Sequence, residues 1–470
     1  MKLHKYLLAL AATAASLTSL AEKPNLIVIM TDDMGYNDVG FNGGTEIPTP
    51  HIDTIADQGV RFTNGYVSYP VCGPSRAGFI TGRYQQRFGF ERNPQYRTDD
   101  PNMGLPLSEE TIAEVLEKVG YTSGIVGKWH LGAHPDLHPL SRGFDFFHGH
   151  LGGGHNFFPE LLTIKDSYEA TNEPQSYQTW IMRNHDHVEP TKYLTDDFSD
   201  AAVEFIDTNK DKPFFLFLSY NAPHTPMHAT EEYLARFPDI KDQKRRTYAA
   251  MMSAVDDGVG RVMAKLEEHG LGDNTLVFFL SDNGGSSKNA SNNTPLRGNK
   301  SDIWEGGYRV PFALRWDGKL KGGGDYDEPV SSLDILGTIA GLTGVPIAED
   351  RPLDGVNLIP YLTGEAEGRP HEVLYLRKWD QKRYTVRMGD YKLVIPWKGG
   401  KPQLYNLADD LDEKKNIIKQ HPEIAERLEK LRAEWESELM EPRFLGLIHT
   451  DAWKKKGKKN NAKKQDAKKN

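Results

Sequence analysis

The sequence has 470 residues, with 57 Lys and Arg against 66 Asp and Glu, 38% apolar residues and a single cysteine. This composition is typical of globular proteins and excludes a disordered or fibrous chain, and the length predicts two or three domains. The acidic balance argues against nucleic acid as the main partner. No segment after the first residues approaches roughly 18 uninterrupted apolar residues, so no membrane span is predicted.

The two ends of the chain differ in composition from its body. Residues 1–21 begin with Lys2 and Lys5, continue as an apolar run and end in small residues at Ala21, which is the pattern of a cleaved secretory signal peptide. We therefore expect a periplasmic or secreted protein. At the other end, residues 454–470 contain nine lysines and one aspartate and are predicted to form a disordered tail.

The body contains short apolar segments that are each followed at once by charged or imidazole side chains. Four such segments span residues 25–30, 121–126, 213–220 and 275–280. Continuous apolar runs of this length are typical of strands that are covered on both faces. The sequence therefore predicts four buried strands whose ends carry polar residues.

Amphipathic helical patterns lie between these predicted strands. One helix is expected to begin at Pro50, a second to span residues 108–119 with Ser108 as its N-cap, and a third to span residues 247–269. Alternation of strands and helices predicts an α/β fold, with a large and mainly parallel sheet flanked by helices.

A different pattern begins near residue 365. Short strands with turn-like connections are predicted at residues 372–377, 384–388 and 391–396, followed by a helix over residues 422–439. We interpret residues 22–364 as the main domain. Residues 365–453 are interpreted as a smaller C-terminal α+β subdomain built on an antiparallel sheet.

Acidic pairs follow the first and the last of the four apolar segments. Asp32 and Asp33 follow one, and Asp282 and Asn283 follow the other. Because residues after the carboxyl ends of parallel strands meet at one edge of the sheet, these side chains are expected to converge. Three carboxylates and an amide oxygen suit calcium or magnesium better than zinc. Either pair alone is more typical of a loop or a helix cap than of a metal site, so the metal prediction depends on both.

Basic and imidazole side chains accompany the other two segments. Lys128 and His130 follow the second segment, and His224 follows the third. A histidine in such a position is by itself more often an ordinary polar contact than a proton carrier. Together with Lys300 and Arg76, however, these residues can surround an anionic group beside a metal ion. This combination indicates hydrolysis or transfer at a phosphate or sulfate ester.

The single cysteine lies in a distinctive motif. Cys72-Gly-Pro-Ser-Arg76 is followed by Thr81-Gly-Arg83, and a helix is expected to open at Ser75 with its positive end towards the cysteine. Here the sequence resembles the type I sulfatases of the alkaline-phosphatase-like superfamily, whose maturation signature is Cys-x-Pro-Ser-Arg followed by Thr-Gly-Arg. The resemblance extends in family order over nearly the whole mature chain, and the sequence looks most like secreted bacterial carbohydrate sulfatases.

The resemblance implies a modified cysteine and a metal ion. A formylglycine-generating maturation enzyme would convert Cys72 to formylglycine (3-oxoalanine), whose hydrated aldehyde is the nucleophile. This role explains a lone cysteine in an exported protein better than burial does. By family analogy, one Ca²⁺ per chain would be held by five residues: Asp32, Asp33, Cys72 in its modified form, Asp282 and Asn283.

The resemblance also implies roles for the basic residues. Lys128 and Lys300 would bind sulfate oxygens, and Arg76 would hold the nucleophile. His224 would protonate the departing alcohol oxygen, a general-acid role suited to imidazole. His130 is the candidate base that helps to expel sulfate and restore the aldehyde. The main domain, residues 22–364, would then be the catalytic sulfatase domain.

The substrate expected from the resemblance is a sulfated glycan, with galactose or N-acetylgalactosamine sulfate in a polysaccharide or its oligosaccharides as the first choice. Four residues are candidates for binding the sugar: Trp129, His155, Asn156 and Arg297. For the stretch from Phe144 to Asn156 a loop packed by its own phenylalanines is equally expected. Two alternatives stay open: a phosphodiesterase or phosphonate monoester hydrolase of the same superfamily, and a non-catalytic secreted glycan-binding protein.

Overall fold

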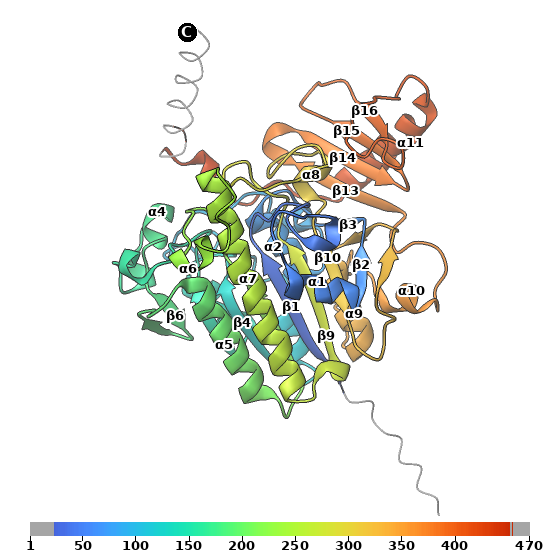
Figure 1. The fold of residues 1–470 in the computed structure, drawn as a ribbon. Helices are drawn as coiled ribbons and strands as arrows, with labels where there is room; N and C mark the ends of the chain where they lie inside the picture. The colour runs from blue at the N-terminus through green and yellow to red at the C-terminus, as the bar shows by residue number, and fades with distance from the viewer. Residues whose placement is uncertain (1–22, 452–453, 455–470) are drawn as a thin grey trace, which may run out of the picture.

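The computed structural model describes residues 23–451 and residue 454 (Figure 1). The predicted signal peptide and residues 455–470 of the predicted tail lie outside the described residues. The described chain forms a ten-stranded sheet, a two-stranded sheet and a four-stranded sheet. Within residues 23–451 and 454, no helix combines the length and the apolar character needed to cross a membrane.

The ten-stranded sheet is parallel at its centre and mixed at its edges. Its strand order is β11-β2-β10-β9-β1-β8-β4-β5-β6-β7, and β9, β1, β8, β4 and β5 are joined by parallel pairings. The four strands predicted from apolar segments are therefore four adjacent central strands. The bounds are β1 Asn25–Thr31, β2 Val60–Phe62, β4 Thr122–Lys128, β5 Phe146–His150, β6 Ile181–Arg183, β7 Asp186–Val188, β8 Phe214–Ser219, β9 Thr275–Ser281, β10 Phe312–Arg315 and β11 Gly324–Tyr326.

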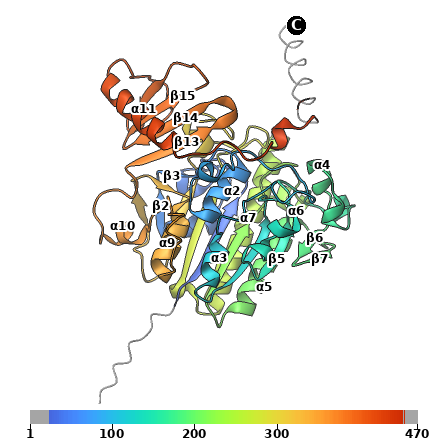
Figure 2. The ribbon, with the colours of Figure 1, turned by 180° about the vertical axis from the view of Figure 1, so that it is seen from behind.

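Helices cover both faces of this sheet because its central strands are apolar on both sides. Ile27 and Ile29 of β1 face a core shared with α1, α5 and α7, whereas Leu26, Val28 and Met30 face a core shared with α2, α3 and α9. Figure 1 shows the first group of helices in front of the sheet, and Figure 2 shows the second group from behind. The bounds are α1 Pro50–Asp57, α2 Cys72–Thr81, α3 Ile112–Glu117, α5 Leu194–Asn209, α7 Gln243–Glu268 and α9 Asp334–Thr343.

Two of the helices predicted between the apolar segments, α3 and α7, begin at other residues than expected. Helix α3 starts after Thr111, whose side chain accepts a hydrogen bond from the backbone N–H of Glu114, while the Glu114 carboxylate accepts from the N–H of Thr111. This reciprocal capping box, rather than Ser108, sets the start of α3. Helix α7 begins at Gln243, earlier than expected, because the side chain of Asp242 caps its first turn.

The C-terminal region forms the predicted antiparallel sheet. It consists of β13 Val373–Lys378, β14 Arg383–Met388, β15 Tyr391–Ile395 and one strand that was not expected, β16 Gln403–Asn406. Helix α11 (Pro422–Glu436) packs on β14 and β15. On the other face, Leu374, Leu376 and Val394 join the core of the main sheet. Because the two regions share this core, the boundary at residue 364 stays a prediction.

A buried ion-pair network also joins the two regions. Lys392 of β15 lies 2.8 Å from carboxylate oxygens of both Glu305 and Glu413, and all three side chains are buried. Burial opposes ionisation of Glu305, but Lys392 and Arg309 lower its pKa to about 2. The pKa of Glu413 is raised by burial to about 7. Lys392 therefore compensates charge on both sides of this junction.

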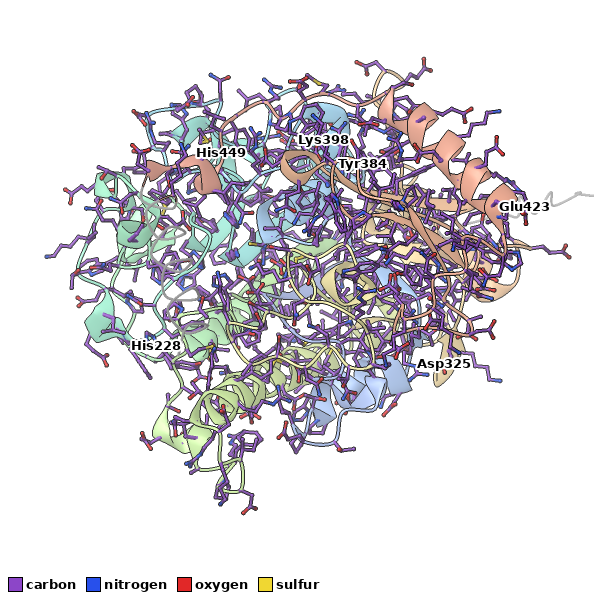
Figure 3. The ribbon with its side chains drawn as sticks, turned by 90° about the horizontal axis from the view of Figure 1, so that it is seen from above. His228, Asp325, Tyr384, Lys398, Glu423 and His449 are labelled. Atoms are coloured by element: carbon purple, nitrogen blue, oxygen red, sulfur yellow. The ribbon has the colours of Figure 1, made fainter. Side chains whose placement is uncertain are left out.

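The shorter elements connect these layers. They are α4 Glu173–Ser176, α6 Glu231–Leu234, α8 Glu305–Tyr308, α10 Ile359–Thr363, and the small sheet of β3 Gly65–Tyr66 and β12 Val330–Ser331. After α11 the chain runs alongside residues 86–93, to which it is joined by backbone hydrogen bonds, and reaches a single helical turn at Leu447–His449. Figure 3 shows His449 on the opposite side of this view from Glu423 at the start of α11.

Candidate active site

The polar residues predicted to converge do so at the carboxyl edge of the central strands. The β-sheet register pairs Thr31 at the end of β1 with Ser281 at the end of β9, and Met30 with Ser219 at the end of β8. On the other side of β8, Ser219 pairs with Gly127, next to the end of β4. The residues that follow these strands therefore come from distant parts of the sequence to one place.

The acidic residues leave buried oxygen atoms free for a cation. Asp32 Oδ1 and Asn283 Oδ1 are buried and have no hydrogen-bond partner among the described residues. Asp32, Cys72 and Asp282 each offer one ligand atom, and these three atoms lie within 4.8 Å of one another. Buried carboxylate and amide oxygens without donors are costly unless a cation compensates them. The donor set fits a hard divalent cation such as Ca²⁺.

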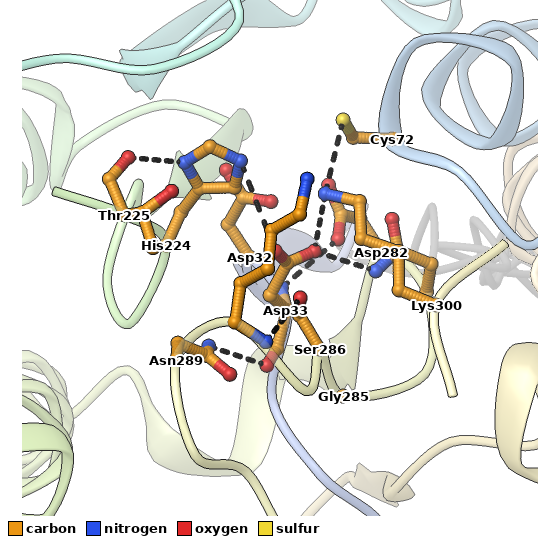
Figure 4. A network of polar contacts seen from close by, with 12 residues as sticks. Asp32, Asp33, Cys72, His224, Thr225, Asp282, Gly285, Ser286, Asn289 and Lys300 are labelled. Carbon is orange, nitrogen blue, oxygen red and sulfur yellow. Dashed lines mark hydrogen bonds and ion pairs between the residues drawn. The ribbon is translucent and has the colours of Figure 1, made fainter. Parts of the chain in front are cut away.

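Asp33 connects this acidic group to the basic side of the site (Figure 4). Its carboxylate lies 2.6 Å from Lys300 Nζ and accepts a hydrogen bond of 2.8 Å from Asn283 Nδ2. His224 Nε2 is 3.7 Å from the other carboxylate oxygen. Burial opposes ionisation, but Lys300 and His224 lower the pKa of Asp33 to about 2. Asp33 also has a left-handed backbone, with φ of 67°, a conformation that is concentrated at functional sites.

Arg76 and Lys128 hold the other two carboxylates. Arg76 Nε lies 2.9 Å from Asp282 Oδ2, and its Nη1 donates to Ser219 Oγ at 2.5 Å. Lys128 Nζ lies 2.6 Å from Asp32 Oδ2, and both of these side chains are fully buried. Burial and the nearby Asp32 raise the pKa of Asp282 to about 6. Acidic and basic groups thus alternate across the floor of the site.

Cys72 is the first residue of α2, so the helix opens three residues earlier than the predicted start at Ser75. Its Sγ lies 3.7 Å from Lys300 Nζ and 3.6 Å from Nδ2 of Asn93. The Asn93 Oδ1 in turn accepts from the backbone N–H of Gly73 at 2.9 Å. Burial raises the pKa of the Cys72 thiol, so the unmodified side chain is a poor nucleophile near neutral pH.

The two predicted catalytic histidines line the same cavity as Cys72. His224 Nδ1 donates to the carbonyl oxygen of Thr225 at 2.6 Å, so Nε2 is the nitrogen that faces Asp33. Both ring nitrogens of His130 are buried without a partner among the described residues. A Cβ at Gly153 would lie only 2.6 Å from His130 Nε2, so the ring needs a glycine at that position. Burial and nearby cations lower the pKa of both imidazoles.

A cavity of about 780 Å³ opens above this floor and is lined by Cys72, His130, His224 and Lys300. Sequence patterns did not reveal several other lining residues, which come from separate loops and from the C-terminal region: Asn93, Glu173, Tyr177, Lys378 and Gln381. None of these follows a strand of the central sheet or lies in a recognisable motif. Only the folded chain brings them together.

The structure does not place the four predicted sugar-binding residues in the lining of this cavity. Trp129 is 1% exposed, packs edge-on against Phe144 and donates its indole N–H to the carbonyl oxygen of Leu137 at 2.8 Å. The indole is therefore a core side chain with its one donor satisfied.

The side chains of the other three candidates also contact other residues of the protein. His155 is fully buried, and its ring centre lies 4.8 Å from that of His150. Asn156 donates to the carbonyl oxygen of Leu161 at 3.4 Å. The Arg297 guanidinium lies 3.6 Å from the ring centre of Trp304 and donates to the Glu413 carbonyl oxygen, so it supports the junction with the C-terminal region.

Comparison with known proteins agrees with this site. Residues 24–345 match the Sulfatase family, and residues 299–441 match the family described as N-sulphoglucosamine sulphohydrolase, C-terminal. The chain is 34% identical to N-acetylgalactosamine-6-sulfatase of Mus musculus, with 83% of this chain and 75% of the relative covered. It is 30% identical to the uncharacterized sulfatase YdeN of Escherichia coli K12, over 87% of this chain and 84% of the relative.

A solved structure is also similar to this protein over most of its length. The crystal structure of Ps i-CgsB in complex with k-i-k-neocarrahexaose superposes with a TM-score of 0.86 at 38% identity, covering 92% of this chain and 96% of that one. The chain belongs to the sulfatase family, whose members hydrolyse sulfate esters. Fold, site and relatives identify the protein as a sulfuric ester hydrolase that is similar to carbohydrate sulfatases.

Proposed function

We propose that this protein releases inorganic sulfate from a sulfated glycan, through a formylglycine made from Cys72 and with Ca²⁺ at the acidic cluster. The observation that carries the proposal is the position of Cys72. Its Sγ is at the start of α2, beside Lys300, and is grouped with Asp32 and Asp282 within 4.8 Å. Because burial raises its pKa, Cys72 is a poor candidate for a thiolate nucleophile at this position. Hydrated formylglycine, which carries two hydroxyl groups, suits a position beside a lysine and an acidic cluster better.

The sugar expected is a galactose or N-acetylgalactosamine sulfate unit of a polysaccharide or its oligosaccharides. The cavity of about 780 Å³ has room for sugar residues beyond the sulfate group. The names of similar proteins support this class, because one is an N-acetylgalactosamine-6-sulfatase and another was crystallised with a neocarrahexaose. The choice of sugar rests on those proteins and on the cavity together.

The acidic cluster would hold the metal ion. Asp32, Asp33, Asp282 and Asn283 offer the oxygen ligands, and the buried oxygens of Asp32 and Asn283 lack another partner among the described residues. When bound, Ca²⁺ supplies positive charge that polarises the sulfate group and offsets the acids. The chain itself supplies the remaining catalytic groups.

Lys128, Lys300 and Arg76 position the sulfate and the nucleophile. Lys300 Nζ lies between Asp33 and Cys72 and can reach a sulfate oxygen attached at that position. Lys128 is held at 2.6 Å by Asp32. Arg76, fixed by Asp282 and Ser219, orients the start of α2. Because these cations are already in place, little reorganisation is needed when negative charge develops.

The histidines move the protons. With Nδ1 of His224 donating to Thr225, Nε2 carries a proton only in the imidazolium form, and in that form Nε2 would protonate the departing alcohol oxygen. His130, whose two ring nitrogens have no partner among the described residues, lines the same cavity as Cys72 and would accept a proton from the converted side chain when sulfate leaves. One general acid and one general base therefore flank the reacting group.

The location and the maturation partner are part of the same proposal. The N-terminal pattern of residues 1–21 indicates export to the periplasm or the medium by a cleaved signal peptide. The motif from Cys72 to Arg76, continued by Thr81-Gly-Arg83, is the sequence that a formylglycine-generating enzyme would recognise. We expect the protein to need such an enzyme when it is produced in another host.

The test is release of free sulfate by protein produced with a formylglycine-generating enzyme. The panel contains defined sulfated galactose, N-acetylgalactosamine, glucosamine, fucose and uronate saccharides, and mass spectrometry of the Cys72 peptide reports the conversion. We expect release from one sugar and position, reduced at least about 10⁴-fold in Cys72→Ala.

Three results would contradict the proposal. Turnover of phosphate or phosphonate esters instead of sulfate esters by converted protein identifies the phosphohydrolase alternative. Binding of a glycan without any turnover by converted protein identifies the glycan-binding alternative. Full activity in Cys72→Ala would exclude Cys72 as the nucleophile.

A further inference from the structure

The charged residues that line the cavity are mostly paired with opposite charges. Lys300 is held by Asp33 at 2.6 Å, and Arg92 binds Asp380 through two nitrogens, at 2.6 and 3.0 Å. The lining residue Glu91 is paired at 2.5 Å with Arg377 on β13. Groups that are neutralised in this way contribute little net charge to recognition of a ligand.

Lys378, at the end of β13, differs from these groups. It lines the cavity although its side chain is only 6% exposed. Its ammonium donates to the carbonyl oxygen of Ser301, and among residues 23–451 and 454 no carboxylate lies within ion-pair distance of it. Burial and the nearby Arg383 lower the pKa of Lys378 to about 8, although the more distant carboxylates of Asp302 and Asp380 act in the opposite direction. A buried ammonium with one carbonyl partner is costly, and an anion would compensate it.

The position of Lys378 connects it to the reacting group. Ser301, which accepts its hydrogen bond, follows Lys300, whose Nζ is 3.7 Å from Cys72 Sγ. On the wall near His130, the buried carboxyl group of Glu173 accepts from the Gly153 N–H at 2.9 Å, and in its ionised form it disfavours a second anion there. The cavity is thus polarised, with an acid at one wall and an unpaired cation at another.

We propose that Lys378 binds a second anionic group of the substrate, so that this enzyme prefers glycans carrying two anionic groups over glycans carrying one. The group is a second sulfate ester or a uronate carboxylate, since both present oxygens to an ammonium. This preference rests on the proposed function, because it assumes that the first sulfate is placed at Cys72. It adds a specificity residue from the C-terminal region to the site built by the central sheet.

Binding to an inactive background tests this proposal without turnover. In Cys72→Ala protein loaded with Ca²⁺, calorimetry compares three oligosaccharides that share one galactose or N-acetylgalactosamine sulfate. The first has no other anion, the second has a second sulfate and the third has a neighbouring uronate. Lys378→Gln keeps a donor for the Ser301 carbonyl oxygen and removes the charge, so it separates charge from local structure.

We expect Lys378→Gln to weaken binding of the preferred two-anion saccharide by about 10- to 100-fold and that of the single-anion saccharide by less than about threefold. The second and third saccharides show whether sulfate or carboxylate is the group bound. Lys382→Gln is the matched control, because Lys382 is close in sequence but lies over the Trp379 ring and does not line the cavity. It should leave all affinities unchanged.

The proposal would be overturned if the Cys72→Ala protein bound all three saccharides with equal affinity. It would also be overturned if Lys378→Gln lowered the affinity for all three by the same factor. Equal loss would instead make Lys378 a support for the Lys300 loop. Turnover of the single-anion glycan by converted wild-type protein, without any preference for a second anion, would leave the proposed function intact while removing this inference. Binding of none of the saccharides would overturn both the inference and the proposed glycan class.

Discussion

The floor of the site and the walls of its cavity are built in different ways. The floor comes from the carboxyl ends of β1, β4, β8 and β9 and from the start of α2, and its charges are buried in close ion pairs such as Lys128 with Asp32. The walls come from loops, from α4 and from β13, and include Glu173 and Lys378, which lack ion-pair partners among the described residues. A rigid sheet thus positions the chemistry, while peripheral segments present the groups that can distinguish substrates.

The largest expected effect on sulfate release comes from removing a carboxylate from the floor of the site. Asp282→Asn removes a carboxylate from the acidic cluster and the partner of Arg76. We expect sulfate release to fall by at least about 10³-fold. We also expect Ca²⁺ to raise the Tm of the wild type and not that of Asp282→Asn, because a ligand that binds only the folded state raises stability.

The control for this prediction is Asp325→Asn, which breaks only a half-exposed ion pair with Arg61 on an outer strand (Figure 3). It should leave both the activity and the Ca²⁺ effect unchanged. A calcium-dependent Tm in Asp282→Asn equal to that of wild type would show that the ion binds elsewhere.

Removing His224, the proposed general acid, should have a smaller effect that depends on the leaving group. His224→Ala is expected to slow hydrolysis of a sugar sulfate by about 10²- to 10⁴-fold. With 4-nitrophenyl sulfate the loss should be much smaller, because a phenolate with electron-withdrawing substituents leaves without a proton. Rates on the two esters give the answer, with His228→Ala as control since His228 does not line the cavity. Equal losses on both esters would assign His224 to binding.

The junction between the two regions can be broken without touching the floor. Lys392→Met leaves Glu305 and Glu413 buried without their shared cation, which is expected to cost about 3–5 kcal/mol of unfolding free energy. Urea unfolding measures this change, and exposed Lys398→Met should change stability by less than about 0.5 kcal/mol. Equal stability of the two variants would show that the network does not hold the C-terminal sheet in place.

The smallest effect concerns the acidic wall and depends on pH. Burial raises the pKa of Glu173 from 4.5 to about 7 in the folded protein. The protonated form is therefore favoured by folding, and its contribution to stability is present below pH 4.5 and is lost as pH rises through 7. We compare the free energy of unfolding of Glu173→Gln with that of wild type. The variant's advantage should be larger at pH 8 than at pH 5, by up to about 3 kcal/mol.

Unfolding free energies at the two pH values test this prediction. Glu423→Gln, at an exposed position in the first turn of α11, is the matched control and should show no such pH dependence. A constant difference between wild type and Glu173→Gln across this pH range would mean that Glu173 is ionised throughout.

Much of the fold could be predicted because buried strands have a strong local pattern. Residues 25–30 and 275–280 are continuous apolar runs, and they form neighbouring central strands β1 and β9. Helix starts were less predictable, as at Ser108 and Ser75, because several residues can cap a helix and the surrounding chain selects one. The short strand β16 lacked a distinctive pattern and was missed.

The floor of the site was predictable and its walls were not. Asp32, Asp33 and Asp282 follow strong strand signals, so their meeting at one edge follows from parallel topology. Trp129 was expected near the sugar, but its indole lies in the core and does not line the cavity, and an aromatic residue next to Lys128 suits the core equally well. Lys378 and Glu173 have no local pattern that sets them apart from other charged residues.

By itself, the amino-acid sequence determined the central strands, the polar residues at their ends and the motif around Cys72, because each depends on neighbours in the chain. The tertiary structure decided which distant residues complete the site. Asn93 beside the thiol, Glu173 beside Gly153 and Lys378 beside Ser301 are brought in from three separate segments. Such contacts depend on how loops and the C-terminal sheet pack against the core, and no local spacing in the sequence encodes that packing.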